Sequence, residues 1–212
     1  MKRGLILMFV LITGMLSAQE MSKYEAGMTK ALAKMKTDST IADYTATSAL
    51  FERIGDAEKD KWLPYYYAAY TNYMTGWMDE KADKDKIAEK SIQLIEKAEA
   101  LEPKNAELYC MRNMVAVQQM MVDPNSRWMS YGRKASKALE QAKDVDPNNP
   151  RIYYLEAQST FNTPEAFGGG KKAAKPKFEK AVALFATFKL PSAMHPDWGK
   201  EEATKMLEEC NK

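Results

Sequence analysis

The residue types that carry most catalysis and metal binding are scarce in this sequence. His195 is the sole histidine among 212 residues, and cysteine occurs only as Cys110 and Cys210. A common metal site needs His, Cys, Asp or Glu clustered at ligand spacing, and nothing beside His195 supplies a second strong ligand on one helix face. A Ser-His-acid triad would need the same histidine. We therefore expect no catalytic residue, no metal site and no cofactor, and interpret His195 as a loop residue, with Asp197 as a candidate cap of the last helix.

Two short segments resemble ligand-binding loops but lack residues that such loops need. Segment 168–172 places three glycines and two lysines before an expected helix, and a glycine loop at a helix start can hold an anion. A P-loop, however, needs Ser or Thr after its lysine and follows a strand, whereas Ala173 follows Lys172. The acidic segment 79–85 lacks the central glycine and distal glutamate of a calcium loop. We predict a tight turn with Phe167 packed beneath it at the first segment, and a solvated linker at the second.

Aromatic residues are concentrated between positions 62 and 77. Four of them follow one another at spacings of four, three and four residues, so a helix places them on one side: Tyr66, Tyr70, Tyr73 and Trp77. This side can be an exposed binding face, because a tyrosine hydroxyl needs a partner or water. It can equally be core, packed against neighbouring helices or against a stripe of methionines spaced by seven, Met21, Met28 and Met35.

Apolar periodicity predicts helices throughout the chain and no β-sheet, because no segment alternates apolar and polar residues over a strand length. The proline in the first turn of the aromatic helix, Pro64, does little harm there. The predicted helices span 22–37, 41–54, 62–77, 85–101, 106–121, 129–145, 151–161, 172–188 and 196–210.

A motif recurs with a period of 44 residues. Segment 94–109 contains the end of one helix, a Pro-Asn type turn and a second helix that opens with an aromatic residue, and segment 138–153 repeats it. An earlier copy, 50–65, has Lys59 in place of the turn proline, and a partial copy begins at Phe178. Proline after a helix stops it, and the short turn makes the two helices antiparallel.

This pattern resembles the tetratricopeptide-repeat (TPR) family over residues 47–187. In that family the second helix carries small, large and small residues and ends at a proline, and the next helix opens with an aromatic; the matching residues here are Ala135, Leu139, Ala142, Pro147 and Tyr153. A second copy departs from the pattern at Ser91. Since the family's unit has about 34 residues, each copy here is about ten longer, and we place the extra residues between its helices, at 121–126 and 162–170. The resemblance implies an all-α, right-handed α-solenoid of antiparallel helix pairs.

The resemblance also implies a binding face and a function. In TPR arrays one side of each first helix lines a concave groove, which here would display Tyr66, Tyr70 and Tyr73, then Cys110, Met114 and Val117, then Tyr154, Gln158 and Phe161. The expected function is a non-enzymatic scaffold that binds a peptide or partner protein through this groove. The alternative is a small-ligand binding subunit associated with a transport system, with the groove closed into a pocket.

The N-terminal residues have the layout of a secretory signal peptide. Basic Lys2 and Arg3 precede an apolar run over 5–16, which is shorter than the roughly 20 residues that a transmembrane helix needs. We predict cleavage near Gln19, so that 1–18 is the signal peptide and 19–212 is one helical repeat domain. The mature protein is then periplasmic or extracellular, soluble and without a transmembrane segment.

The charge balance argues against nucleic acid and anionic membranes as partners, and the cysteine spacing argues against a disulfide. The chain has 31 basic and 29 acidic residues, and loss of Lys2 and Arg3 leaves 29 of each. A nucleic-acid binder normally shows a basic excess, so we expect neither nucleic acid nor an anionic membrane as a partner. Cys110 and Cys210 belong to distant repeats, which do not touch in an array, and we expect them to be unpaired.

Overall fold

A computed structural model describes residues 21–212, and the predicted signal peptide lies outside them. This part of the chain is all-α, as predicted, and contains no strand. Its elements are α1 (Lys23–Met35), α2 (Ile41–Glu58), α3 (Leu63–Met78), α4 (Lys84–Leu101), α5 (Ala106–Met120), α6 (Pro124–Val145), α7 (Pro150–Asn162), the 3₁₀ helix η1 (Glu165–Phe167), α8 (Lys171–Thr187) and α9 (Lys200–Cys210). None of these helices is long and apolar enough to cross a membrane.

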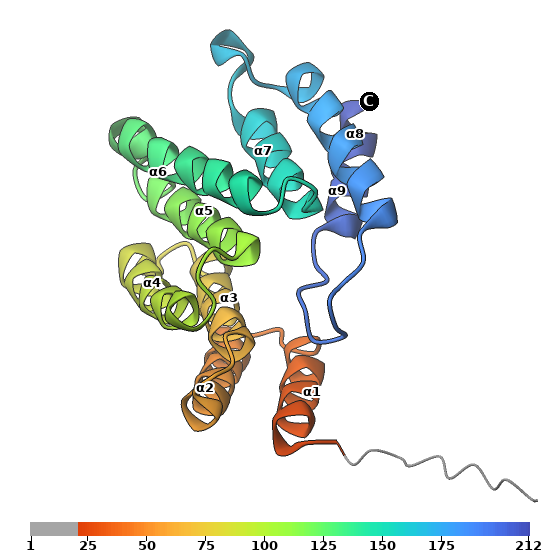
Figure 1. Ribbon diagram of the computed structural model, residues 1–212. Helices are drawn as coiled ribbons and strands as arrows, with labels where there is room; N and C mark the ends of the chain where they lie inside the picture. Colours follow the sequence, from red (N-terminus) through yellow and green to blue (C-terminus); the bar gives the residue numbers. More distant parts are fainter. Residues whose placement is uncertain (1–20) are drawn as a thin grey trace, which may run out of the picture.

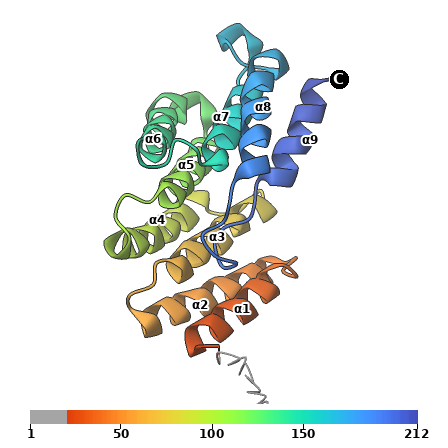
Figure 2. The same cartoon turned by 45° about the vertical axis from the view of Figure 1, so that its right-hand side comes forward.

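The helices form a TPR-like solenoid in which antiparallel neighbours pack in succession. Helices α3, α5 and α7 follow one another along the middle, and each contacts the next. Helices α2, α4 and α6 cover one side of this row, and α1, α8 and α9 lie on the other (Figure 1). The segment between α8 and α9 leaves the lower ends of these two helices and descends toward α1 and α3 (Figure 2).

Core packing follows the small and large residues of the repeat. Ala135, Leu139 and Ala142 are buried along α6, so α5 can approach closely. Ser91, where the family has a small apolar residue, is also fully buried, and its hydroxyl accepts a hydrogen bond of 2.9 Å from Asn72 Nδ2. The polar substitution is therefore tolerated because it has a partner.

Two predicted helix starts were wrong. Helix α6 begins at Pro124 instead of 129, because Asp123 accepts a hydrogen bond from the Ser126 amide and Pro124 is suited to the first helical turn. The extra residues of this repeat therefore lengthen a helix. Helix α9 begins at Lys200 instead of 196, with Gly199 (φ 99°) before it, and Asp197 does not cap it but pairs with Lys36 at 3.7 Å.

The glycine segment is a tight turn, as predicted. Gly168 and Gly170 have φ values of 81° and 86°, and a side chain at Gly169 would collide with the carbonyl oxygen of Thr163 at 2.1 Å. Phe167 does not pack beneath this turn, because 81% of it is exposed. The three-residue helix η1 carries its ring outward into solvent.

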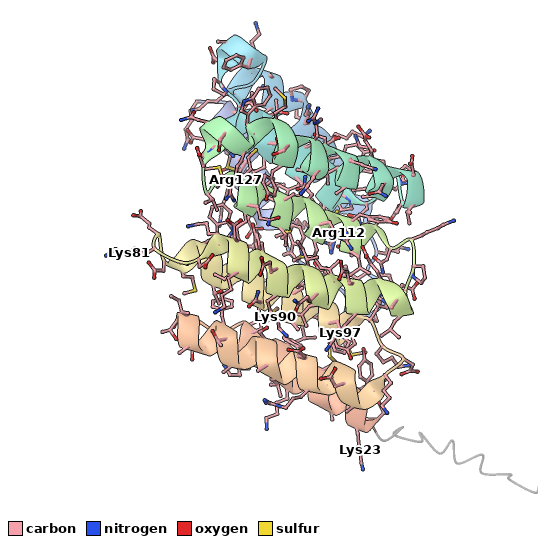
Figure 3. The ribbon with its side chains drawn as sticks, turned by 90° about the vertical axis from the view of Figure 1, so that its left-hand side faces the viewer. Lys23, Lys81, Lys90, Lys97, Arg112 and Arg127 are labelled. Carbon is pink, nitrogen blue, oxygen red and sulfur yellow. The ribbon has the colours of Figure 1, made fainter. Side chains whose placement is uncertain are left out.

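The outer face is held by ion pairs between successive helices (Figure 3). Glu52 of α2 pairs with Lys90 and Lys97 of α4 at 2.8 and 3.1 Å. Further pairs join α4 to α5 through Glu99 and Arg112, and α4 to α6 through Asp85 and Arg127. Exposed pairs of this kind each stabilise a fold by at most about 1 kcal/mol. These ion pairs therefore contribute little to the stability of the fold.

The two phenylalanines that flank the glycine turn test this description of the core. Phe178 is fully buried, so Phe178→Ala should lower the free energy of unfolding by about 3 to 5 kcal/mol. Phe167→Ala serves as the matched control and should change it by less than about 0.5 kcal/mol. Urea denaturation followed by circular dichroism measures both. Equal losses from the two variants would contradict the assigned core.

Candidate functional site

The chain itself covers part of the side on which the groove was predicted. We call residues 188–199, between α8 and α9, the crossing loop. The Tyr67 hydroxyl donates a hydrogen bond of 2.9 Å to the carbonyl oxygen of Met194. The indole N–H of Trp198 donates one of 2.8 Å to the Tyr66 hydroxyl. The loop is thereby fixed to α3 over the concave side.

Trp198 is the centre of an aromatic cluster. Its ring stacks on Tyr70, with centroids 6.1 Å apart and an interplanar angle of 22°. Tyr154 of α7 meets it in a T-shaped arrangement at 6.2 Å. Trp198 therefore occupies the place between α3 and α7 that an open groove would leave to a partner.

The nine predicted groove residues divide into a buried and a half-buried group. Those that are buried are Tyr66, Cys110, Met114 and Tyr154; those that are half-buried are Tyr70, Tyr73, Val117, Gln158 and Phe161. Phe161 contacts Phe178 of α8 with centroids 6.3 Å apart, and Gln158 donates a hydrogen bond of 3.2 Å to the Tyr154 hydroxyl. On the predicted face of α3, Tyr70 and Tyr73 are thus partly accessible, and Trp77 is 44% exposed.

Tyr70 and Tyr154, which both contact Trp198, are neutral at physiological pH. Burial raises the pKa of Tyr70 to about 12, and nearby Tyr44 and Glu202 act in the same direction. Burial raises the pKa of Tyr154 to about 12 as well, with a further contribution from Glu202 of α9. Both hydroxyl groups therefore carry no phenolate charge at physiological pH.

Sequence reasoning missed Arg151 at the start of α7. This arginine is 1% exposed, and its Nε lies 3.4 Å from Oε2 of the buried Glu107 on α5. Glu107 also accepts a hydrogen bond of 2.6 Å from Asn149 Nδ2. The two charged residues are 44 positions apart, one period, so opposite charges at equivalent repeat positions were the available signal.

A cavity of about 250 Å³ lies beside this pair. The starts of α5 and α7 form one wall and the crossing loop forms the other. Its aromatic and apolar lining includes Trp62, Phe188 and Leu190, and His195 lies at the same cavity. Burial, and then Arg151, lower the pKa of His195, whose Nδ1 lies 2.8 Å from the Ser192 hydroxyl.

Neither cysteine forms a disulfide within residues 21–212. Cys110 is buried in α5, and burial raises its pKa well above the usual value. Cys210 is half-buried in α9. The same residues contain no group of three or more His, Cys, Asp or Glu side chains placed to hold a metal ion. Cys110, expected on the groove by resemblance, is therefore a core residue.

Comparison with known proteins supports the fold and adds a family. No protein-family model and no curated protein sequence matches this chain. A thermophilic TPR protein from Thermus thermophilus matches with a TM-score of 0.62 and 16% identity over 88% of this chain and 80% of that one, which supports the TPR-like fold alone. The HusA haemophore from Porphyromonas gingivalis matches with a TM-score of 0.80 and 33% identity, over 90% of this chain and 95% of that one. This chain belongs to the same family as the HusA haemophore.

Removing the indole of Trp198 should release the crossing loop. Opening of this segment then costs less free energy, so trypsin should cut after the exposed Lys189 about tenfold faster or more in Trp198→Ala. Mass spectrometry of early digestion products gives the rate. Trp128→Ala, at an indole that is 59% exposed on α6, is the control and should leave it unchanged. An unaltered rate in Trp198→Ala would show that other contacts hold the loop.

Proposed function

We propose that this chain is an exported, non-enzymatic binding protein for haem or a related tetrapyrrole. The observation that carries the proposal is its membership of one family with the HusA haemophore, at 33% identity over 95% of that chain. The proposal favours the small-ligand alternative from the sequence over the peptide scaffold. Export remains a prediction from the N-terminal residues.

The accessible part of the aromatic face fits such a ligand. A tetrapyrrole is large, flat and mostly apolar, and aromatic side chains give rigid stacking surface at little cost in conformational entropy. Tyr70, Tyr73 and Trp77 lie on one side of α3, and the rings of Tyr73 and Trp77 are 6.1 Å apart. We assign ligand stacking to Tyr70 and Tyr73.

The crossing loop favours a small ligand over an extended peptide. A peptide bound along the concave side would run from α3 to α7, and Trp198 stands between these helices against Tyr70 and Tyr154. A compact ligand needs only the aromatic surface beside the loop. Haem uptake by a neighbouring transporter would also agree with the predicted exported location.

Titration with haem tests the proposal. The purified chain should give a saturable shift of the haem absorption band, and Tyr73→Ala should weaken the affinity about 30-fold, because truncating an aromatic anchor costs about 2 kcal/mol. Tyr131→Ala, on α6 of the outer side, is the matched control and should bind as the parent does. Thermal denaturation must show that both variants are folded. Absence of saturable binding by the parent chain would refute a haem-binding function.

A further inference from the structure

The guanidinium group of Arg151 is buried with fewer partners than it needs. Nε and Nη1 have no hydrogen-bond partner among the described residues, although neither is exposed to solvent. The one carboxylate paired with it, Glu107, is 3.4 Å from Nε, longer than a charge-assisted hydrogen bond of about 2.7 to 2.9 Å. An arginine in this position is costly to bury unless further acceptors reach it.

The surroundings of Arg151 fix the plane of the guanidinium and leave it beside the cavity. The central carbon of the guanidinium is 5.4 Å from the ring centroids of both Phe188 and Trp198. Two aromatic rings of the crossing loop therefore hold the guanidinium in place. Arg151 lines the cavity between the crossing loop and the starts of α5 and α7. Both helices point their N-termini at this cavity, and a helix N-terminus favours negative charge.

The acidic groups around the cavity do not replace the missing acceptor. Glu102 is exposed at the rim, where water screens its charge. Asp146 is half-buried and accepts a hydrogen bond of 3.1 Å from the Asn148 amide. Glu107 is turned partly toward Asn149, and burial raises its pKa. The cation of the cavity lining is Arg151.

We propose that Arg151 and this cavity form a subsite for a carboxylate group of the bound ligand. A guanidinium donates strong hydrogen bonds to a carboxylate, and we assign this contact to the unpaired Nε or Nη1 of Arg151. Because only 1% of Arg151 is exposed, the crossing loop must move for a carboxylate to reach it. At about 250 Å³ the cavity is below the usual range of about 300 to 1,000 Å³ for whole ligands, so it receives one acidic side chain of a larger molecule. The identity of that molecule rests on the proposed function, since haem carries carboxylate side chains at one edge of a flat ring.

The first test changes the ligand and leaves the protein intact. Protoporphyrin and its dimethyl ester present the same ring with and without free carboxylates. The unmodified chain should bind the acid about 10- to 100-fold more tightly, as expected for a hydrogen bond to a charged group. Equal affinities for the acid and the ester would overturn the subsite.

The second test changes Arg151. Arg151→Gln should weaken binding of the acid about 10- to 100-fold and alter binding of the ester less than about twofold. Because this variant leaves Glu107 buried without a cation, the double variant Glu107→Gln with Arg151→Gln is measured beside it. Arg112→Gln, whose guanidinium pairs with Glu99 on the outer side, is the control. Equal loss of both porphyrins in folded variants would overturn the subsite.

A third probe separates the subsite from the proposed function. 2-Naphthoate should shift the indole N–H resonances of Trp62 and Trp198, which lie at and beside the cavity, in the unmodified chain but not in Arg151→Gln. Trp77, at the far end of α3 and about 20 Å from Trp62, is the internal reference. This response without porphyrin binding would retain the subsite and refute the haem function. Absence of the response, or a stronger one to 2-naphthylmethylamine, would refute the subsite.

Discussion

The hydrogen bond from Trp198 to Tyr66 joins residues 132 positions apart and holds the crossing loop over part of the concave side. A TPR-like array otherwise makes contacts only between neighbouring repeats, so its two ends are independent. Here the crossing loop leaves α8, reaches α3 and returns to α9, and Tyr67 fixes it a second time through Met194. The C-terminal helices are thereby tied to the middle of the solenoid. This loop contributes Trp198 to the aromatic cluster and forms one wall of the cavity beside Arg151. It also covers part of α3 and leaves Tyr70 and Tyr73 partly accessible.

The fold could be predicted from the sequence because its information is local and repeated. Apolar periodicity and the recurring proline turn at Pro103 and Pro147 identify the helices and their pairing. The errors occurred where a few residues decide a boundary. Asp123 and Pro124 start α6 early through a side-chain cap, and Gly199, with its positive φ, delays α9. Phe167 was predicted to pack beneath the glycine turn, but it lies in a 3₁₀ turn and is 81% exposed.

The aromatic face of α3 could be predicted only in part. Helical spacing correctly places Tyr66, Tyr70 and Tyr73 on one side of α3, since that depends on the pitch of the helix alone. The cover over Tyr66 could not be predicted, because residues 188–199 have no periodicity and their partners are far away in the sequence. Tyr66 is buried and Tyr70 is half-buried because the indole of Trp198 lies against this part of α3.

The repeat explains how a polar site can arise in the core of a solenoid. One structural position recurs as Leu63, Glu107 and Arg151 in three successive repeats, each 44 residues after the last, and all three side chains are buried. At Leu63 this buried position is apolar, as is usual where helices pack against each other. Glutamate and arginine at the next two positions must compensate each other across adjacent helices, and at 3.4 Å they do so incompletely. Successive repeats keep the backbone constant, so charge can change at one position without altering the fold. Divergence at this position, together with a loop that covers it, converts a packing contact between repeats into a cavity with an unsatisfied cation.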